Sequence, residues 1–199
     1  MRRGRALAGL VVVVAGCAGG DGDEQAVPAT KMRLVVLQPA DLSKAFVRFD
    51  EGPVRLADTP PGPRGDPERF GREGGWKARY RRPGSAATKG PLVIESRIDL
   101  FDGEDGAESE FDAYREELGA EAGGAGRWLD VPRIGDDALA ATSGSGMANS
   151  VRVFRLVWRD GNATASIAAN GFEGRLRLAD VLELVRKQQR RIAAALVTD

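Results

Sequence analysis

Residues 151–169 read VRVFRLVWRDGNATASIAA, the stretch of this chain that decides its fold. Two segments rich in apolar residues, 151–158 and 163–169, flank the tripeptide Asp160-Gly161-Asn162. Asp, Gly and Asn favour tight hairpin turns because they adopt the backbone conformations that such turns require. The stretch therefore predicts a β-hairpin, and with it a sheet whose strands are antiparallel.

More strands are expected upstream of this hairpin. Segments 76–82 and 91–101 alternate apolar and polar residues with a period of two, which is typical of half-buried antiparallel strands. Shorter strands are expected at 46–50, 53–58 and 137–142, and residues 34–37 form a strand or a buried lead-in. The polar face of the two longer strands would hold Lys77, Arg79, Arg81, Glu95, Arg97 and Asp99.

Two segments have helical periodicity, at about 106–118 and 178–196. In each, apolar residues recur three or four positions apart and so line one face. The fold class is therefore α+β, with a mostly antiparallel sheet of about six to eight strands and these two main helices packed on it. The first helix is expected to place Phe111, Tyr114 and Leu118 against Leu92, Ile94, Ile98, Phe154 and Trp158.

The N-terminal residues have the pattern of a secretory signal. Arg2, Arg3 and Arg5 precede an apolar run over residues 6–15, and the run is too short to span a bilayer as an ordinary helix. The run ends in the sequence Val14-Ala15-Gly16-Cys17, which contains the only cysteine of the chain.

These four residues resemble the lipobox of bacterial lipoproteins. The resemblance implies that Cys17 carries diacylglycerol, that the chain is cut before it, and that the protein is attached by lipid to the cell membrane and faces outside the cytoplasm. The expected organisation is a signal peptide over 1–16, a flexible tether over 17–31 and a single α+β domain over 32–199. The layout of this domain is similar to the PsbP-like and PknH-sensor-like extracytoplasmic domains, and the similarity implies no functional residue.

Composition excludes several classes of site. The 199 residues include no histidine, which rules out Ser-His-Asp catalysis and the usual zinc ligand sets. Beyond residue 16 there are 26 basic and 29 acidic residues, which argues against a nucleic-acid partner. We therefore expect no catalytic residue of these types, no metal and no cofactor.

Arginine-rich segments supply the candidate binding residues. Residues 59–75 hold several prolines and glycines and read as a long irregular loop that leads into the charged face of 76–82. One interpretation is a site for an anionic ligand, since arginine pairs with carboxylate and phosphate. The alternative is a solvated face of ion pairs beside a surface loop. The candidates are Arg64, Arg69, Arg72, Lys77, Arg79, Arg81, Arg97 and Trp128.

Three functions fit these observations. The first is a non-catalytic lipoprotein that binds a small molecule or a protein partner at the cell envelope. The second is a hydrolase that uses carboxylates or a Ser-Lys pair. The third is a structural or assembly subunit of an envelope complex. A concave pocket with convergent polar groups would favour the first of these.

Overall fold

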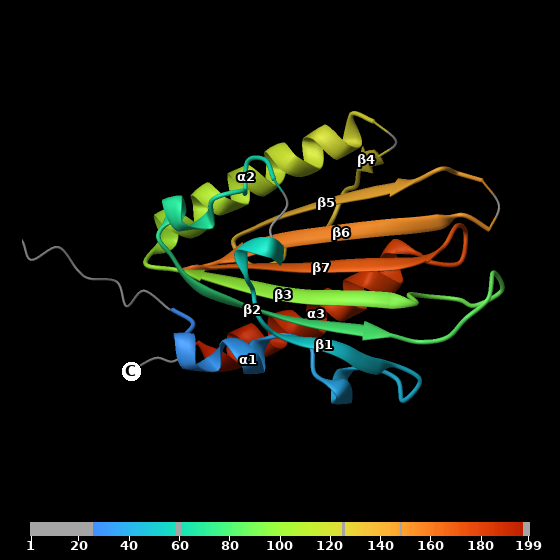
Figure 1. The fold of residues 1–199 in the computed structure, drawn as a ribbon, viewed down its shortest axis with the longest axis horizontal. Coiled ribbons are helices and arrows are strands. Elements are labelled where there is room, and N and C mark those ends of the chain that lie inside the picture. Colours follow the sequence, from blue (N-terminus) through green and yellow to red (C-terminus); the bar gives the residue numbers. More distant parts are fainter. Residues whose placement is uncertain (1–25, 59–60, 125, 148, 197–199) are drawn as a thin grey trace, which may run out of the picture.

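The computed structural model describes residues 26–58, 61–124, 126–147 and 149–196 (Figure 1). Within these residues, seven strands form one antiparallel sheet in the order β1-β2-β3-β7-β6-β5-β4. The fold class is therefore α+β, as the alternation predicts. The strands are β1 (Val47–Pro53), β2 (Arg72–Arg81), β3 (Val93–Phe101), β4 (Gly126–Trp128), β5 (Asp137–Gly144), β6 (Val151–Asp160) and β7 (Ala163–Phe172).

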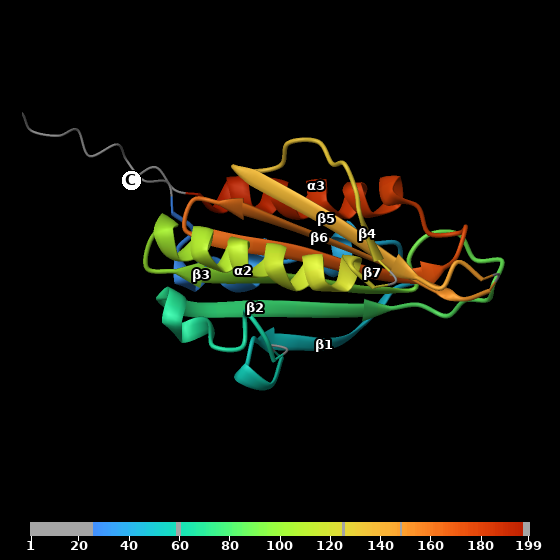
Figure 2. The same cartoon turned by 90° about the horizontal axis from the view of Figure 1, so that it is seen from above.

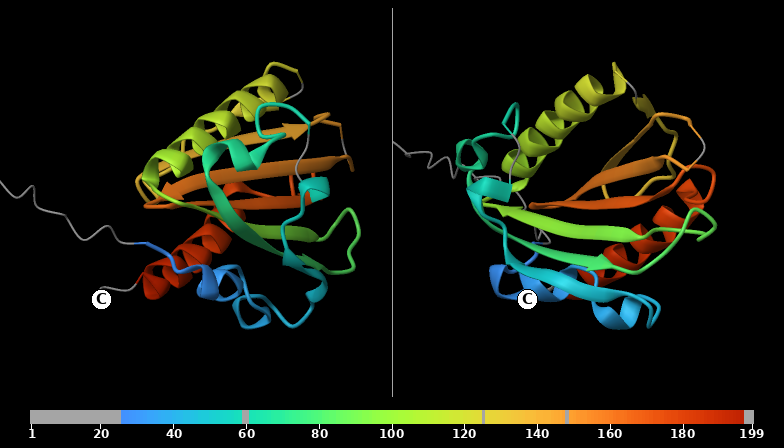
Figure 3. Two further views of the ribbon diagram at one scale, coloured as in Figure 1. Left: turned by 60° about the vertical axis from the view of Figure 1, so that its left-hand side comes forward. Right: turned by 45° about the vertical axis from the view of Figure 1, so that its right-hand side comes forward.

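Two long helices cover opposite faces of this sheet, α2 (Glu104–Ala122) and α3 (Leu178–Ala195), as Figures 2 and 3 show. The short helix α1 (Met32–Val35) packs beside α3. The larger buried cluster lies under α3 and takes its side chains from all the central strands. A smaller cluster lies under α2 and consists of Phe111, Tyr114, Leu118, Leu139, Ala141 and Val157.

The expected packing of α2 is wrong. Phe111, Tyr114 and Leu118 are buried, but not against the expected partners. Ile94, Ile98, Phe154 and Trp158 lie in the cluster under α3, and Leu92 is not part of the cluster under α2. Successive side chains of a strand point to opposite faces. Strand β6 has apolar residues in both phases of that alternation, so its sequence does not say which face a helix covers.

A buried hydrogen-bond network joins α3 and the N-terminal segment to the sheet. The Ser96 hydroxyl donates to Gln188 Oε1 at 2.8 Å, and Gln188 Nε2 donates to the carbonyl oxygen of Arg97 at 2.9 Å. The N–H of Leu37 donates to Ser96 Oγ, and the hydroxyl of Tyr80 donates to the Leu37 carbonyl oxygen. Each buried polar group in this set has a partner, as a stable interior requires.

Two segments near the N-terminus differ from expectation, and a third takes one of its two expected forms. Residues 53–58 are not a separate strand, because β1 ends at Pro53 and a 3₁₀ turn follows at Leu56–Asp58. Of the two forms expected for residues 34–37, the structure has the buried lead-in, partly helical, with Val35, Val36 and Leu37 buried and Leu34 exposed. Val27 is 2% exposed and its N–H donates to Asn162 Oδ1 at 3.0 Å, so the packed structure begins before residue 32. The predicted signal peptide and Cys17 lie outside the described residues.

Packing on opposite faces can be tested by energetic coupling. Phe111→Ala should lower the free energy of unfolding by about 3–5 kcal/mol, because it opens a cavity in a packed cluster. In double-mutant cycles, Phe111→Ala should couple to Leu139→Ala by about 0.5–3 kcal/mol and to Phe154→Ala by less than about 0.5 kcal/mol. Urea unfolding measures both cycles. Stronger coupling of Phe111 to Phe154 than to Leu139 would show that α2 packs on the other face of the sheet and would contradict the structure.

Candidate functional site

The face of the sheet under α2 is made of residues that lie side by side in rows across the strands. Their register places polar residues over β2 and β3 and small residues on β7, at the centre of the sheet. The rows, from the β6–β7 turn outward, are Lys77-Arg97-Ser166-Val157-Leu139, Arg79-Glu95-Ala168-Arg155-Ala141 and Arg81-Val93-Asn170-Val153-Ser143. The residues that the sequence predicts as one charged face therefore do share a face.

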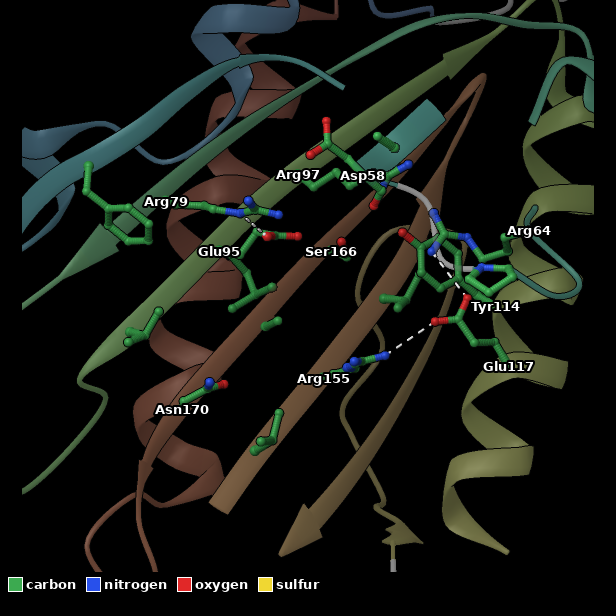
Figure 4. A pocket seen from close by; sticks show the side chains of 18 residues that line it. Asp58, Arg64, Arg79, Glu95, Arg97, Tyr114, Glu117, Arg155, Ser166 and Asn170 are labelled. Atoms are coloured by element: carbon green, nitrogen blue, oxygen red, sulfur yellow. Dashed lines mark hydrogen bonds and ion pairs between the residues drawn. The ribbon is translucent and has the colours of Figure 1, made fainter. Parts of the chain in front are cut away.

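A cavity of about 720 Å³ opens on this face (Figure 4). Its floor is β3, β7 and β6, and its walls include Tyr114 and Glu117 of α2 and Asp58 and Arg64 of the segment after β1. The apolar side of α2 rests on β5 and β6, while β7 places Ser166, Ala168 and Asn170 in the floor of the cavity. Small side chains beneath an uncovered stretch of sheet leave the space open.

Arg64 joins the segment after β1 to α2. Its Nε donates to Glu110 Oε1 at 2.7 Å, and its Nη1 lies 3.4 Å from Glu117 Oε2. The guanidinium carbon lies 3.3 Å from the centre of the Tyr114 ring. The side chain is only 3% exposed, so these partners replace water around a buried cation.

Arg97 is the second buried arginine of the cavity. Its Nε donates to Asp99 Oδ2, and its Nη1 approaches the carbonyl oxygen of Asp58 at 3.5 Å. Asp99 also pairs with Arg72 from β2. Burial alone would lower the pKa of Arg97, but Tyr114 and Asp99 raise it above the ordinary arginine value. Arg97 therefore stays charged inside the protein.

Both buried arginines have a guanidinium nitrogen without a hydrogen-bond partner among the described residues, Nη2 in each case. Arg64 and Arg97 are also close enough for each charge to affect the other. Burial and the charge of Arg97 both act to lower the pKa of Arg64, and Tyr114, Glu110 and Asp99 act to raise it. The pKa of Arg64 ends above its ordinary value. The inner end of the cavity thus holds two charged guanidinium groups, each with one nitrogen that has no hydrogen-bond partner among the described residues.

Two nearby carboxyls have pKa values shifted in opposite directions. Burial raises the pKa of Glu110, and the charge of Arg64 offsets only part of this rise. Burial also acts to raise the pKa of Asp58, but hydrogen bonds from Lys77 and from the N–H of Arg55 outweigh it, and the pKa is lowered. Glu110 lies behind Arg64 and does not line the cavity, whereas Asp58 does.

The structure brings three of the eight predicted binding residues to the cavity, namely Arg64, Arg79 and Arg97. Arg72 and Lys77 are held beside it by Asp99 and by Asp58. The expectation of a solvated charged face is therefore wrong for its inner part. Lys77, Arg97 and Asp99 are buried there, with exposed fractions of 7%, 4% and 0%.

The other three predicted residues lie outside the cavity lining. Arg69 is exposed and donates to the Pro63 carbonyl oxygen, and its guanidinium lies over the Phe70 ring. Arg81 is exposed over Phe49 at the outer rim. Trp128 is on β4 at the edge of the sheet and is 46% exposed. Whether any of the eight binds a ligand stays a prediction.

Sequence reasoning missed six polar residues of the cavity: Asp58, Tyr114, Glu117, Arg155, Ser166 and Asn170. Ser166 occupies the polar phase of the alternation in β7, so the pattern contained a signal for it, whereas β6 is apolar in both phases and gave no signal for Arg155. Glu117 is bonded to both Arg64 and Arg155, and this bridge has no local sequence signature. Tyr114 was expected only as a core residue, and it is both a core and a cavity residue.

The criterion for a carboxylate hydrolase is two carboxyls at the bottom of a cleft, one with a raised pKa. Among the residues that the structure describes, the carboxyls with a raised pKa are Glu110 and Asp160, and neither lines the cavity. Burial is the main cause of both shifts. In the described part of the chain, no three Cys, Asp or Glu side chains are grouped so as to hold a metal ion. No helix among those residues is long and apolar enough to cross a membrane.

Comparisons with known proteins bear on the fold. No family model matches the chain, and no curated protein matches it significantly. Among solved structures, the extracellular domain of PknH from Mycobacterium tuberculosis is similar, with a TM-score of 0.65 and 11% sequence identity. The match covers 86% of this chain and 99% of that domain. At this identity the likeness establishes a shared fold, in agreement with the expected PknH-sensor-like layout.

The two shifted carboxyls predict opposite effects of pH on stability. Glu110 keeps its proton to a higher pH in the folded than in the unfolded protein, so folding loses stability as pH rises above 4.5, the ordinary value. Relative to Glu110→Gln, the parent should therefore become less stable as pH rises. Asp58 has the reverse shift, so relative to Asp58→Asn the parent should lose stability as pH falls below 3.8.

Urea unfolding of the parent and both variants between about pH 2.5 and 7 measures these differences. Each variant should differ from the parent by a constant free energy of unfolding because an ion pair is lost. The test is therefore how the difference in free energy of unfolding changes with pH. A Glu110 difference that is flat or of opposite slope would contradict the assignment.

Proposed function

We propose that this protein is a lipid-anchored, extracytoplasmic, non-catalytic binding protein that takes a small molecule into the cavity between α2 and the sheet. The observation that carries the proposal is the 720 Å³ cavity with two buried arginines at its inner end. Its volume falls within the range of about 300–1,000 Å³ that is usual for small-molecule sites. Its lining combines apolar side chains with convergent polar groups, and it is richer in charged residues than most such sites.

The lipid anchor rests on the sequence Val14-Ala15-Gly16-Cys17 behind a cationic and apolar start. The fold supports the same placement, because the similar PknH structure is described as an extracellular domain. The first described residues pack at the β6–β7 turn, where Val27 bonds to Asn162. An anchor at Cys17 would therefore join the domain at the end of the sheet opposite Val93 and Asn170.

A non-catalytic role is supported by how the polar groups of the cavity are engaged. Asp58 and Glu117 are bound to basic side chains, and no histidine exists to serve as a base. Ser150, an exposed candidate for a Ser-Lys pair, has its hydroxyl bonded to the carbonyl oxygen of Met147 outside the cavity. A charged network of this kind favours holding a ligand over activating a nucleophile.

Lipidation at Cys17 is expected to be detectable directly. Mass spectrometry of the protein purified from bacterial membranes should show a mature chain that begins at Cys17 and carries diacylglycerol and an amide-linked acyl chain. Several chains together anchor a protein stably, whereas one binds only marginally. Cys17→Ala should leave the precursor uncleaved, since the processing implied by the resemblance acts on the lipidated cysteine. A mature chain with another start, or an unmodified Cys17, would overturn the anchor.

The cavity is expected to be the binding site for small-molecule fragments. A fragment collection screened by thermal shift and ligand-observed NMR should give hits on the parent protein. Ala168→Phe should abolish them, because Ala168 lies on the floor and a phenyl ring would fill the space. Ala120→Phe adds the same volume on an exposed position of α2 and serves as the matched control. Hits that survive Ala168→Phe, or no hits on the parent, would contradict the proposed site.

A further inference from the structure

The inner end of the cavity offers hydrogen-bond donors and few free acceptors. Asp58 accepts from Lys77 on Oδ1 and from a backbone N–H on Oδ2. Glu117 accepts from Arg64 on Oε2 and from Arg155 on Oε1. Both carboxylates therefore use both of their oxygens within the protein, and a ligand with positive charge would have to displace an existing cation.

The two arginines at the same end each have one nitrogen that donates no hydrogen bond within the described residues. Arg64 and Arg97 each use two of three guanidinium nitrogens, and Nη2 of each is buried without a partner among the described residues. Their side chains are 3% and 5% exposed, so water does not replace the missing bonds freely. A buried donor without a partner costs free energy, and an anion that accepts from both would relieve that cost.

The outer end of the cavity has a different character. Val93 and Val153 flank Asn170 there in one row, and Phe49 lines the same side. Val93 and Phe49 are exposed by 36% and 46%, which is high for large apolar side chains. Between the two ends lie Ala168 and the Arg79–Glu95 ion pair, which is complete within the protein.

The distance between the two ends follows from strand geometry. Val93 and Arg97 are four residues apart on β3, and a strand advances about 3.3 Å per residue, so the ends are about 13 Å apart. A ligand that satisfies both ends therefore has an anionic group at one end and an apolar body long enough to reach the valines.

We propose that the ligand is a single-chain amphiphilic anion, with a carboxylate or phosphate head bound by Nη2 of Arg64 and Arg97 and an aliphatic chain lying over Val93 and Val153. This inference rests on the proposed function and narrows it to one chemical class. The head group pairs with fixed buried donors, and the chain covers apolar surface that the fold leaves in water.

Isothermal titration calorimetry with a set of matched probes tests the proposal. Octanoate and octyl phosphate carry both features, octanol and octylamine lack the negative charge, and acetate lacks the chain. We expect the better of the two anionic amphiphiles to bind at least 10-fold more tightly than octanol, octylamine or acetate. The comparison between octanoate and octyl phosphate distinguishes the two head groups.

Variants locate the binding. Arg97→Gln should weaken the preferred anion about 10-fold or more and leave octanol unchanged, while Arg190→Gln, at an exposed position on α3, should change neither. If Arg97→Gln does not fold, the comparison of probes on the parent protein still decides the question. Ala168→Phe should remove binding of every probe.

The outcomes distinguish the ligand class from the proposed small-molecule site. Octanol or octylamine that binds as tightly as the anions, in a manner blocked by Ala168→Phe, would overturn the amphiphilic anion and leave a small-molecule site. Binding of acetate as tight as that of octanoate would remove the need for the apolar end and would also overturn the proposal. Anionic probes that bind equally well to Ala168→Phe, or that do not bind the parent at all, would reject the ligand class at this cavity. The fragment screen then decides separately whether the cavity binds small molecules.

Discussion

The buried charge of Arg97 constrains the rest of this structure. Arg97 and Asp99 lie on the central strand β3 with exposed fractions of 4% and 0%, and a buried ion is stable only when it is paired and hydrogen-bonded. Asp99 is shared with Arg72, so these three residues carry two positive charges and one negative charge. Glu110 of α2 and the incoming Arg64 extend the same network, with Tyr114 stacked on Arg64. The position of α2 and the path of the chain before β2 therefore follow from pairing requirements as well as from apolar burial.

The two faces of the sheet are packed differently. Under α3, β7 contributes Ala163, Ala165, Ile167 and Ala169, and the helix closes over a continuous apolar cluster. Under α2, apolar contacts are made only with β5 and β6, and the centre of the sheet, at β3 and β7, is occupied by charged and small residues. A helix cannot pack tightly on paired charges and small side chains together, so a cavity remains beside it. The charged and small residues that cost stability on this face are also the ones that leave the cavity open.

The sequence predicts the local elements well because their signals are local. The hairpin of β6 and β7, the pairing of β2 with β3 and the two long helices all follow from alternation, periodicity and turn residues. The side of the sheet that α2 covers does not follow, because β6 is apolar in both phases. The burial of Arg64 does not follow from the sequence either, because residues 61–66 have no periodicity and Arg64 is paired with Glu110, far along the chain. Arg79 and Arg97 were found because they lie on regular strands, whereas the Glu117 bridge to Arg155 joins two elements through tertiary contact alone.

The central claim is that buried arginines present unused donors to the cavity, and side-chain NMR of arginine tests it most directly. In protein labelled with ¹⁵N, the Nη groups of Arg64 and Arg97 should give resolved signals, because paired and buried guanidinium groups rotate slowly. The exposed Arg190 should give averaged signals and serves as the internal reference. Addition of an anionic ligand should shift the Nη2 signals of both buried arginines and leave Arg190 unchanged. Averaged signals from Arg64 and Arg97 that match those of Arg190 would contradict the account.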